Sequence, residues 1–157
     1  RKATLGAAYV ANGLLEADTA KFVRAVCRWG HYAGVGGKVL KRNPVRTIRA
    51  RMLAAHLALQ EGDPLTAITE VTNLNGLGVS FGSKHLKFLS PERAVVLDSI
   101  ISERLGYRRT PEDYVAFLRD CEAIRDIINS QRIVASADQP VWRVSDVEMA
   151  IFKSLNP

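Results

Sequence analysis

The sequence predicts an all-α protein, and three features of its 157 residues indicate this class. Apolar residues recur every three or four positions through most of the chain, which is typical of helices that bury one face. Capping residues and prolines precede these stretches, and glycines follow several of them. The apolar run at 94–97 is too short to predict a strand, and only Ile133–Val134 hints at one. The length suits one domain over 1–157, or two small helical lobes around a cleft.

The first third of the chain predicts a short helical lead-in and two longer amphipathic helices. The lead-in covers 3–15, where small residues dominate. The first long helix covers 18–30 and is expected to take its cap from one of the first two residues of that range. The second covers 43–62 and has a proline at its start. The glycine-rich stretch at 34–37 lacks the preceding strand that a nucleotide-binding loop needs, so we interpret it as a flexible connector.

Two helices joined by a tight turn are predicted at about 63–89. Asp63 is a cap residue that precedes a proline, a common start for a helix. The first helix ends before Gly76 and Gly78, which flank one apolar residue, and a second amphipathic helix covers 79–89. The expected apolar face of the first helix consists of Leu65, Ile68, Val71 and Leu74.

Three further helices are predicted in the remainder of the chain. The first covers 99–106 and takes Asp98 as its cap. A capping-box pattern starts a long helix over 110–128, and a second one at 145–148 starts the terminal helix. A loop is expected at 136–140 between the two helices. The residues expected to face inward are Tyr114, Phe117, Leu118, Cys121, Ile124, Ile127 and Ile128 on the long helix, and Val147, Ala150, Ile151 and Leu155 on the terminal one.

The turn at 76–78 is predicted to bind a phosphate group. Because its two glycines have no side chains, their backbone N–H groups can approach an anion closely. The first turn of the following helix adds unpaired N–H groups and the positive end of a helix dipole. Phosphate is therefore the expected ligand of this turn.

The distribution of charge supports a nucleic-acid partner. The chain has a net charge of +6, and between Asp18 and Glu61 it has nine Lys or Arg residues and no acidic residue. A one-sided basic segment suits binding to a phosphate backbone. The alternatives are a solvated basic face without a partner and a helical adaptor that meets an acidic protein. We expect double-stranded DNA, contacted by Arg42, Arg46, Gly76, Gly78, Ser80 and Lys87.

The stretch at about 63–105 resembles the helix-hairpin-helix unit of the DNA glycosylase superfamily, in particular the lyase-type 8-oxoguanine DNA glycosylases. Those enzymes have a Gly-x-Gly turn, a nucleophilic lysine two residues later, and an aspartate just under twenty residues beyond the turn. Gly76, Gly78 and Asp98 match this pattern. Ser80 occupies the usual lysine position, and Lys84 lies one helical turn further along the same face, about 6 Å away.

The resemblance implies a multi-helix glycosylase-like fold and a catalytic role for Lys84 and Asp98. A neutral lysine can attack C1′ of a flipped nucleotide, form a Schiff base and cut the strand by β-elimination. The carboxylate can stabilise positive charge on the sugar. If Lys84 instead meets phosphate or solvent, Asp98 would activate water in a monofunctional enzyme. Lys87 is the second candidate nucleophile, and 8-oxoguanine is the expected lesion.

Aromatic residues at the end of the helix over 18–30 are candidates for stacking on an extruded base. They are Trp29, His31 and Tyr32, although Trp29 also fits the apolar stripe of its helix and could pack in the core. His85 is expected at the surface or against a phosphate.

No metal or other cofactor is expected, because Cys27 and Cys121 are too few and too far apart for a zinc site or an iron–sulfur cluster. No apolar run approaches the roughly 20 residues of a membrane span. We therefore expect a monomeric cytoplasmic enzyme, associated with the nucleoid if the source is bacterial. The main alternative is a helix-hairpin-helix protein that binds DNA without catalysis.

Overall fold

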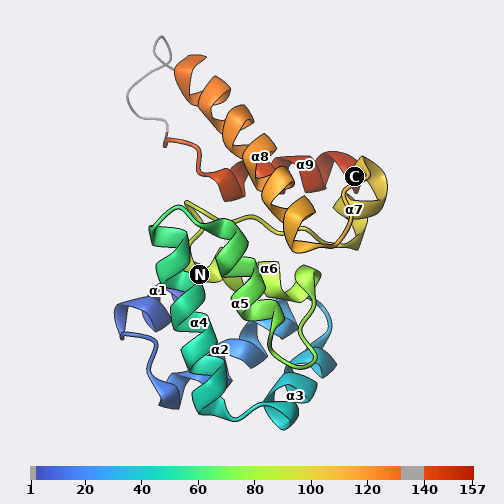
Figure 1. The fold of residues 1–157 in the computed structure, drawn as a ribbon. Coiled ribbons are helices and arrows are strands. Elements are labelled where there is room, and N and C mark those ends of the chain that lie inside the picture. The colour runs from blue at the N-terminus through green and yellow to red at the C-terminus, as the bar shows by residue number, and fades with distance from the viewer. Residues whose placement is uncertain (1–2, 132–139) are drawn as a thin grey trace.

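The computed structural model describes residues 3–131 and 140–157, which form nine α-helices and no strand (Figure 1). The all-α prediction is confirmed for this part of the chain. Ile133–Val134, where the sequence hinted at a strand, lie outside the described residues. So do residues 136–139 of the loop expected over 136–140. The helices are α1 (Ala3–Ala11), α2 (Glu16–Trp29), α3 (Ala33–Arg42), α4 (Val45–Gln60), α5 (Pro64–Thr72), α6 (Val79–Leu89), α7 (Ser99–Leu105), α8 (Pro111–Gln131) and α9 (Val144–Leu155).

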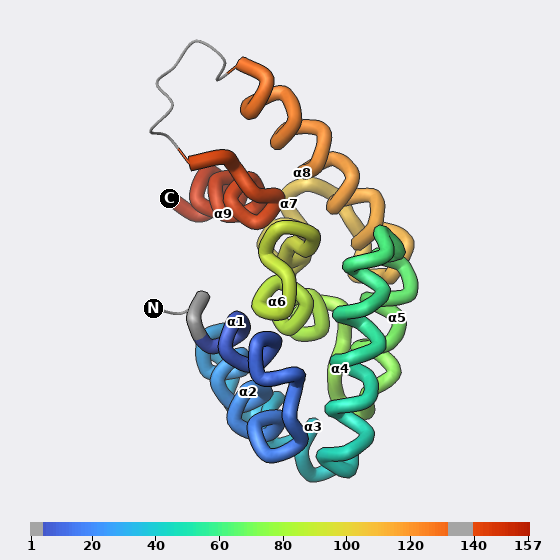
Figure 2. The backbone as a smooth tube through the Cα atoms, turned by 90° about the vertical axis from the view of Figure 1, so that its left-hand side faces the viewer, coloured from blue at the N-terminus to red at the C-terminus, as the bar shows by residue number. Residues whose placement is uncertain are grey.

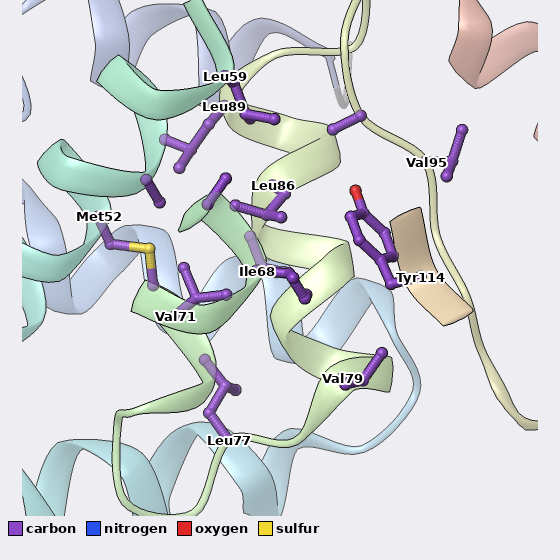
Figure 3. Packing of buried hydrophobic residues seen from close by; sticks show 14 of the residues in the cluster. Met52, Leu59, Ile68, Val71, Leu77, Val79, Leu86, Leu89, Val95 and Tyr114 are labelled. Carbon is purple, nitrogen blue, oxygen red and sulfur yellow. The ribbon is translucent and has the colours of Figure 1, made fainter. Parts of the chain in front are cut away.

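Helix α6 lies in the middle of the molecule, with α4 and α5 on one side and α1 and α2 on another (Figure 2). Its apolar residues enter a core shared with α4, α5 and α8, where Leu86 lies near Ile68 and Tyr114 (Figure 3). Polar residues of α6 are buried too, which is unusual for a helix in a protein of this size. The position of this helix therefore depends on neighbours around most of its circumference.

Two glycines allow neighbouring helices to approach α6 closely. A Cβ atom added at Gly6 of α1 would lie 1.9 Å from the Phe88 carbonyl oxygen of α6. On α6 itself, a Cβ at Gly82 would lie 3.1 Å from a methyl group of Val71 in α5. The α1–α6 contact thus excludes any larger residue, because the obstructing atom belongs to the backbone.

The helix predicted over 18–30 begins earlier than expected. Helix α2 starts at Glu16, and neither Asp18 nor Thr19 caps it. The Thr19 hydroxyl is buried and bonded to the Tyr9 hydroxyl at 2.7 Å and the Leu15 carbonyl at 3.0 Å. The Thr19 side chain, which the sequence predicted as a possible helix cap, therefore forms a tertiary contact with α1 instead. The end of the helix at Gly30 is confirmed.

The prediction of a flexible connector at 34–37 is wrong, because these glycines belong to helix α3. Gly36 is buried against Cys27 of α2, where a Cβ would lie 3.3 Å from the cysteine Cβ. Val39 is fully buried on the same helix. Packing against α2 therefore outweighs the low helix propensity of glycine.

The helices predicted at 43–62, 63–89 and 99–106 are close to those observed. Asp63 caps α5 by accepting the Thr66 N–H at 3.1 Å, and Asp98 caps α7 by accepting the Ile101 N–H at 3.0 Å. Of the apolar face expected for α5, Ile68 and Val71 are buried in the helix, Leu74 is buried just beyond its end, and Leu65 is exposed at its first turn.

The C-terminal helices differ from the prediction in their details. Asp146 bonds the Arg143 N–H at 2.8 Å, so the capping box of α9 begins two residues before the expected one. Ser145, the expected cap, is buried. Ile124 and Ile127 of α8, which were expected to face inward, are exposed because the end of α8 extends beyond the core (Figure 1). Ala150 of α9 was also expected to face inward and is exposed.

We predict that Gly6→Ala lowers the free energy of unfolding by about 1–3 kcal/mol or more, because α1 must move away from α6. Gly37→Ala is the matched control, since a Cβ there meets nothing within 4 Å in an exposed part of α3. It should leave stability unchanged or raise it by up to about 1 kcal/mol. Urea denaturation of both variants measures this, and equal effects would contradict the close contact.

Candidate active site

A cavity of about 660 Å³ lies where the end of α2, helix α6, the start of α7 and helix α9 meet. It combines residues from both halves of the chain, and apolar and aromatic groups form much of its wall. The residues predicted from sequence that line it are Trp29, His31, Tyr32, Ser80, Lys84, Lys87 and Asp98. The other predicted residues, Arg42, Arg46, Gly76 and Gly78, lie outside it.

Lys84 of α6 points into the cavity rather than into open solvent. Only 8% of the residue is exposed, and its Nζ atom lies 4.0 Å from the centre of the Phe81 ring and 3.4 Å from the Ser80 hydroxyl. Gly30 leaves room for both side chains, because a Cβ there would lie 2.8 Å from the Phe81 ring and 3.1 Å from Cδ of Lys84. The serine at the usual lysine position therefore becomes a hydrogen-bond partner of the lysine one turn later.

Burial makes the ammonium form of Lys84 less favourable than that of an exposed lysine. Burial lowers the pKa of Lys84 below its ordinary value, and the Asp98 carboxylate opposes this effect by favouring the charged form. Within the described chain, no carboxylate forms an ion pair with Lys84. A lysine in this setting is more available as a nucleophile than an exposed one.

Asp98 reaches the cavity because the segment before it is bonded to α6. The Ser83 hydroxyl of α6 accepts the Leu97 N–H at 3.1 Å and donates to the Ser80 carbonyl at 2.9 Å. The next residue, Asp98, uses one oxygen to cap α7, which leaves the other without a hydrogen-bond partner among the described residues. Ser83 thus places the carboxylate in the same cavity as Lys84.

Glu148, a buried carboxylate of α9 that was not predicted from the sequence, lines the same cavity. It accepts from Lys87 at 2.9 Å, and the two side chains are only 5% and 11% exposed. Burial raises the pKa of Glu148, while the Lys87 ammonium opposes the rise. One signal was available: Glu148 falls in the apolar stripe of α9 between Val144 and Ile151. The pair also shows that Lys87 faces the cavity rather than bulk solvent.

The three predicted stacking residues occupy the end of α2 and the turn after it. Trp29 packs edge-on against Phe88, with ring centres 5.1 Å apart, and the Lys87 ammonium lies 5.3 Å from the centre of the Trp29 ring. Tyr32 is 62% exposed, so its ring is free to contact a ligand. His31 adopts a left-handed backbone conformation with φ of 62°, which is uncommon for a residue with a side chain.

The turn between α5 and α6 is held by protein contacts while its glycines stay exposed. The Asn43 side chain donates to the Asn75 carbonyl at 2.9 Å and accepts the Asn75 N–H at 3.0 Å. Leu77 is buried, whereas Gly76 and Gly78 are exposed. Gly76 has φ of 89°, which favours glycine.

Basic side chains lie beside this turn. A Cβ added at Gly76 would lie 3.8 Å from the Arg42 guanidinium and 3.8 Å from Cβ of Lys38, so these two basic residues lie beside the exposed backbone. Lys38 was not among the predicted contacts. Arg46 is exposed on α4, the helix that follows α3 in the chain.

The prediction that His85 lies at the surface is wrong. Its ring is completely buried, and Nδ1 lies 2.7 Å from the Phe81 carbonyl oxygen, to which it can only donate. Burial lowers the pKa of His85 to about 4, so the ring is neutral at pH 7. It packs edge-on against Phe22 and is part of the core.

No metal site is evident in the part of the chain that the structure describes, where His, Cys, Asp and Glu form no group of three or more able to hold an ion. Among the same residues, no helix is long and apolar enough to span a membrane. Comparison with protein-family models, curated proteins and solved structures found no match. Function is therefore inferred from the residues and geometry of this chain.

We predict that Lys84 titrates below the ordinary lysine value, because burial disfavours its ammonium form. Asp98→Asn should lower this pKa further, since removing the carboxylate removes a group that favours the charge. NMR of the ¹³C-methylated lysines measures both values, with Lys84→Arg assigning the resonance. An ordinary pKa that does not respond to Asp98→Asn would contradict the shared cavity.

Proposed function

We propose that this protein is a helix-hairpin-helix DNA glycosylase that flips a damaged nucleotide into the cavity and removes its base. The observation that carries the proposal is that Lys84 and Asp98 line one cavity together with aromatic side chains. These two residues come from the stretch that resembles the glycosylases. We also propose that the nine described helices are a variant of the glycosylase-like fold.

The cavity is suited to hold a nucleobase. Its volume of about 660 Å³ lies within the roughly 300–1,000 Å³ that is usual for small-molecule sites. Trp29, Tyr32 and Phe81 offer aromatic surface, and charged groups lie beside them. Stacking on aromatic rings and hydrogen bonds to the base edge are the usual means of holding a flipped base.

The turn at 76–78 is proposed to hold the DNA strand from outside the cavity. Its exposed glycines allow a phosphate to approach the backbone N–H groups, and Arg42 and Lys38 add positive charge beside them. The turn leads directly into α6, which carries Lys84. Contact at the turn would therefore set the position of the sugar relative to the lysine.

Lys84 is proposed to act as the nucleophile. Its neutral amine attacks C1′ while the C1′–N bond to the base breaks, and the base leaves with the bonding electrons and is then protonated. Loss of a proton and opening of the sugar yield a Schiff base, from which β-elimination breaks the C3′–O bond. Asp98 stabilises positive charge on the sugar during the first step. We propose 8-oxoguanine as the lesion.

We predict that borohydride traps a covalent adduct between the full chain and duplex DNA containing an abasic site or 8-oxoguanine. Lys84→Gln should abolish the adduct while DNA binding changes less than about threefold, because many other contacts hold the strand. Asp98→Asn should slow base release by about 10²–10³-fold. The lysine-to-glutamine control is Lys41→Gln, at the exposed end of α3.

An adduct that persists in the Lys84→Gln variant would show that another amine is the nucleophile. Lys87 would then be the first candidate. No adduct and no base release from a panel of lesions would leave a protein that binds DNA without catalysis.

We predict that Gly78→Ala weakens DNA binding at least about tenfold without unfolding the protein. No atom lies within 4 Å of a Cβ added there, and the residue has an ordinary φ of −90°, so the fold can accept the change. The new methyl group would nevertheless obstruct a phosphate at the backbone. Gly37→Ala lies outside the turn, where an added Cβ meets no atom within 4 Å, and is the control for a glycine substitution. Fluorescence anisotropy measures binding, and unchanged affinity would exclude the turn as the DNA contact.

A further inference from the structure

The ion pair between Lys87 and Glu148 is an unusual feature of the cavity wall. Its two charges come from α6 and α9, lie 2.9 Å apart and are almost fully buried among apolar and aromatic side chains. Burying two charges has a desolvation cost that an apolar pair of similar size would avoid. A ligand with complementary polar groups would account for charges at this position.

We propose that Glu148 and Lys87 select the base by reading a guanine-type edge. This inference rests on the proposed glycosylase function and adds a specificity-determining pair that the resemblance does not supply. A carboxylate only accepts hydrogen bonds and an ammonium only donates them. The pair therefore presents an acceptor beside a donor to whatever occupies the cavity.

A guanine-type edge fits this arrangement better than an adenine-type edge. Guanine and 8-oxoguanine have two adjacent donors, N1–H and the 2-amino group, next to the O6 acceptor. The donors match the Glu148 carboxylate, and O6 matches the Lys87 ammonium. Adenine has one donor, its 6-amino group, beside the N1 acceptor, so it satisfies the carboxylate less completely. A buried polar group left unpaired by the wrong ligand gives strong discrimination.

The position of Lys87 near Trp29 supports this role. The ammonium lies 5.3 Å from the centre of the Trp29 ring, and this contact and the bond to Glu148 limit its movement. A base that packs beside Trp29 would meet a donor and an acceptor that are already in place. Arg109 and Lys153 also line the cavity, but both are exposed at its rim.

The test compares release of 8-oxoguanine with release of 8-oxoadenine from otherwise identical duplexes under single-turnover conditions. The two lesions share the 8-oxo group and differ at the edge that Glu148 is proposed to read. We expect the unmodified chain to release 8-oxoguanine at least about tenfold faster. Glu148→Gln should reduce this preference at least about tenfold, because an amide places a donor where a carboxylate accepts.

Controls separate this inference from the proposed function. Abasic-site trapping involves no base, so it reports on Lys84 alone. Lys87→Gln is a second variant that should also reduce the preference, and it decides the matter if Glu148→Gln fails to fold. Glu122→Gln changes an exposed ion pair with Arg119 on α8 and controls for loss of a glutamate charge.

Three outcomes would overturn the inference. If both variants keep the original preference, Glu148 and Lys87 do not read the base. If the unmodified chain releases both lesions equally, the pair is not selective, although the proposed function stands. If neither lesion is released, with or without trapping on abasic DNA, the proposed removal of 8-oxoguanine fails and the inference fails with it.

Discussion

The burial of α6 on most of its circumference is the constraint on which the rest of the structure depends. A helix in this position has little freedom to rotate or slide. Helix α1 packs closely against it at Gly6, α5 packs closely against it at Gly82, and the core around Leu86 surrounds its apolar residues. Its polar residues therefore take fixed directions. Lys84 and Lys87 face the cavity, while Ser83 bonds the segment that carries Asp98.

This constraint also explains how residues distant in the sequence share one site. Ser83 joins the chain before α7 to α6, and the Lys87–Glu148 ion pair joins α9 to the same helix. Each of these contacts attaches one wall of the cavity to α6. The cavity is thus built around a single helix, and the two halves of the chain contribute to it through specific polar bonds rather than through apolar packing alone.

Local sequence signals predicted the parts of the fold where they agree with tertiary packing. The helices α4, α5 and α6 and the caps at Asp63 and Asp98 follow from periodicity and capping chemistry. Prediction from the sequence failed where tertiary packing overrides local helix propensity. The glycines of α3 are helical because they fit against α2, and Thr19 bonds Tyr9 instead of capping a helix.

The same distinction applies to the candidate site. Lys84 and Asp98 could be named because the stretch at about 63–105 resembles the glycosylase motif, and the aromatic residues after α2 because of their position beside glycines. The apolar stripe of α9 could indicate that Glu148 is buried, but it could not place the residue in this cavity, because its partner Lys87 lies 61 residues away. Charge alone suggested phosphate contact for Lys87, whereas its burial depends on where α9 packs.

The double hydrogen bond between Asn43 and the backbone of Asn75 has a consequence for association with a partner. It holds the turn at 76–78 in shape before any ligand arrives, so little loop entropy remains to be lost when a ligand binds. For the DNA contact proposed at this turn, affinity would then depend mainly on direct contacts and released counterions. Recognition by a preorganised turn of this kind is rapid, because no slow folding of the loop has to precede contact.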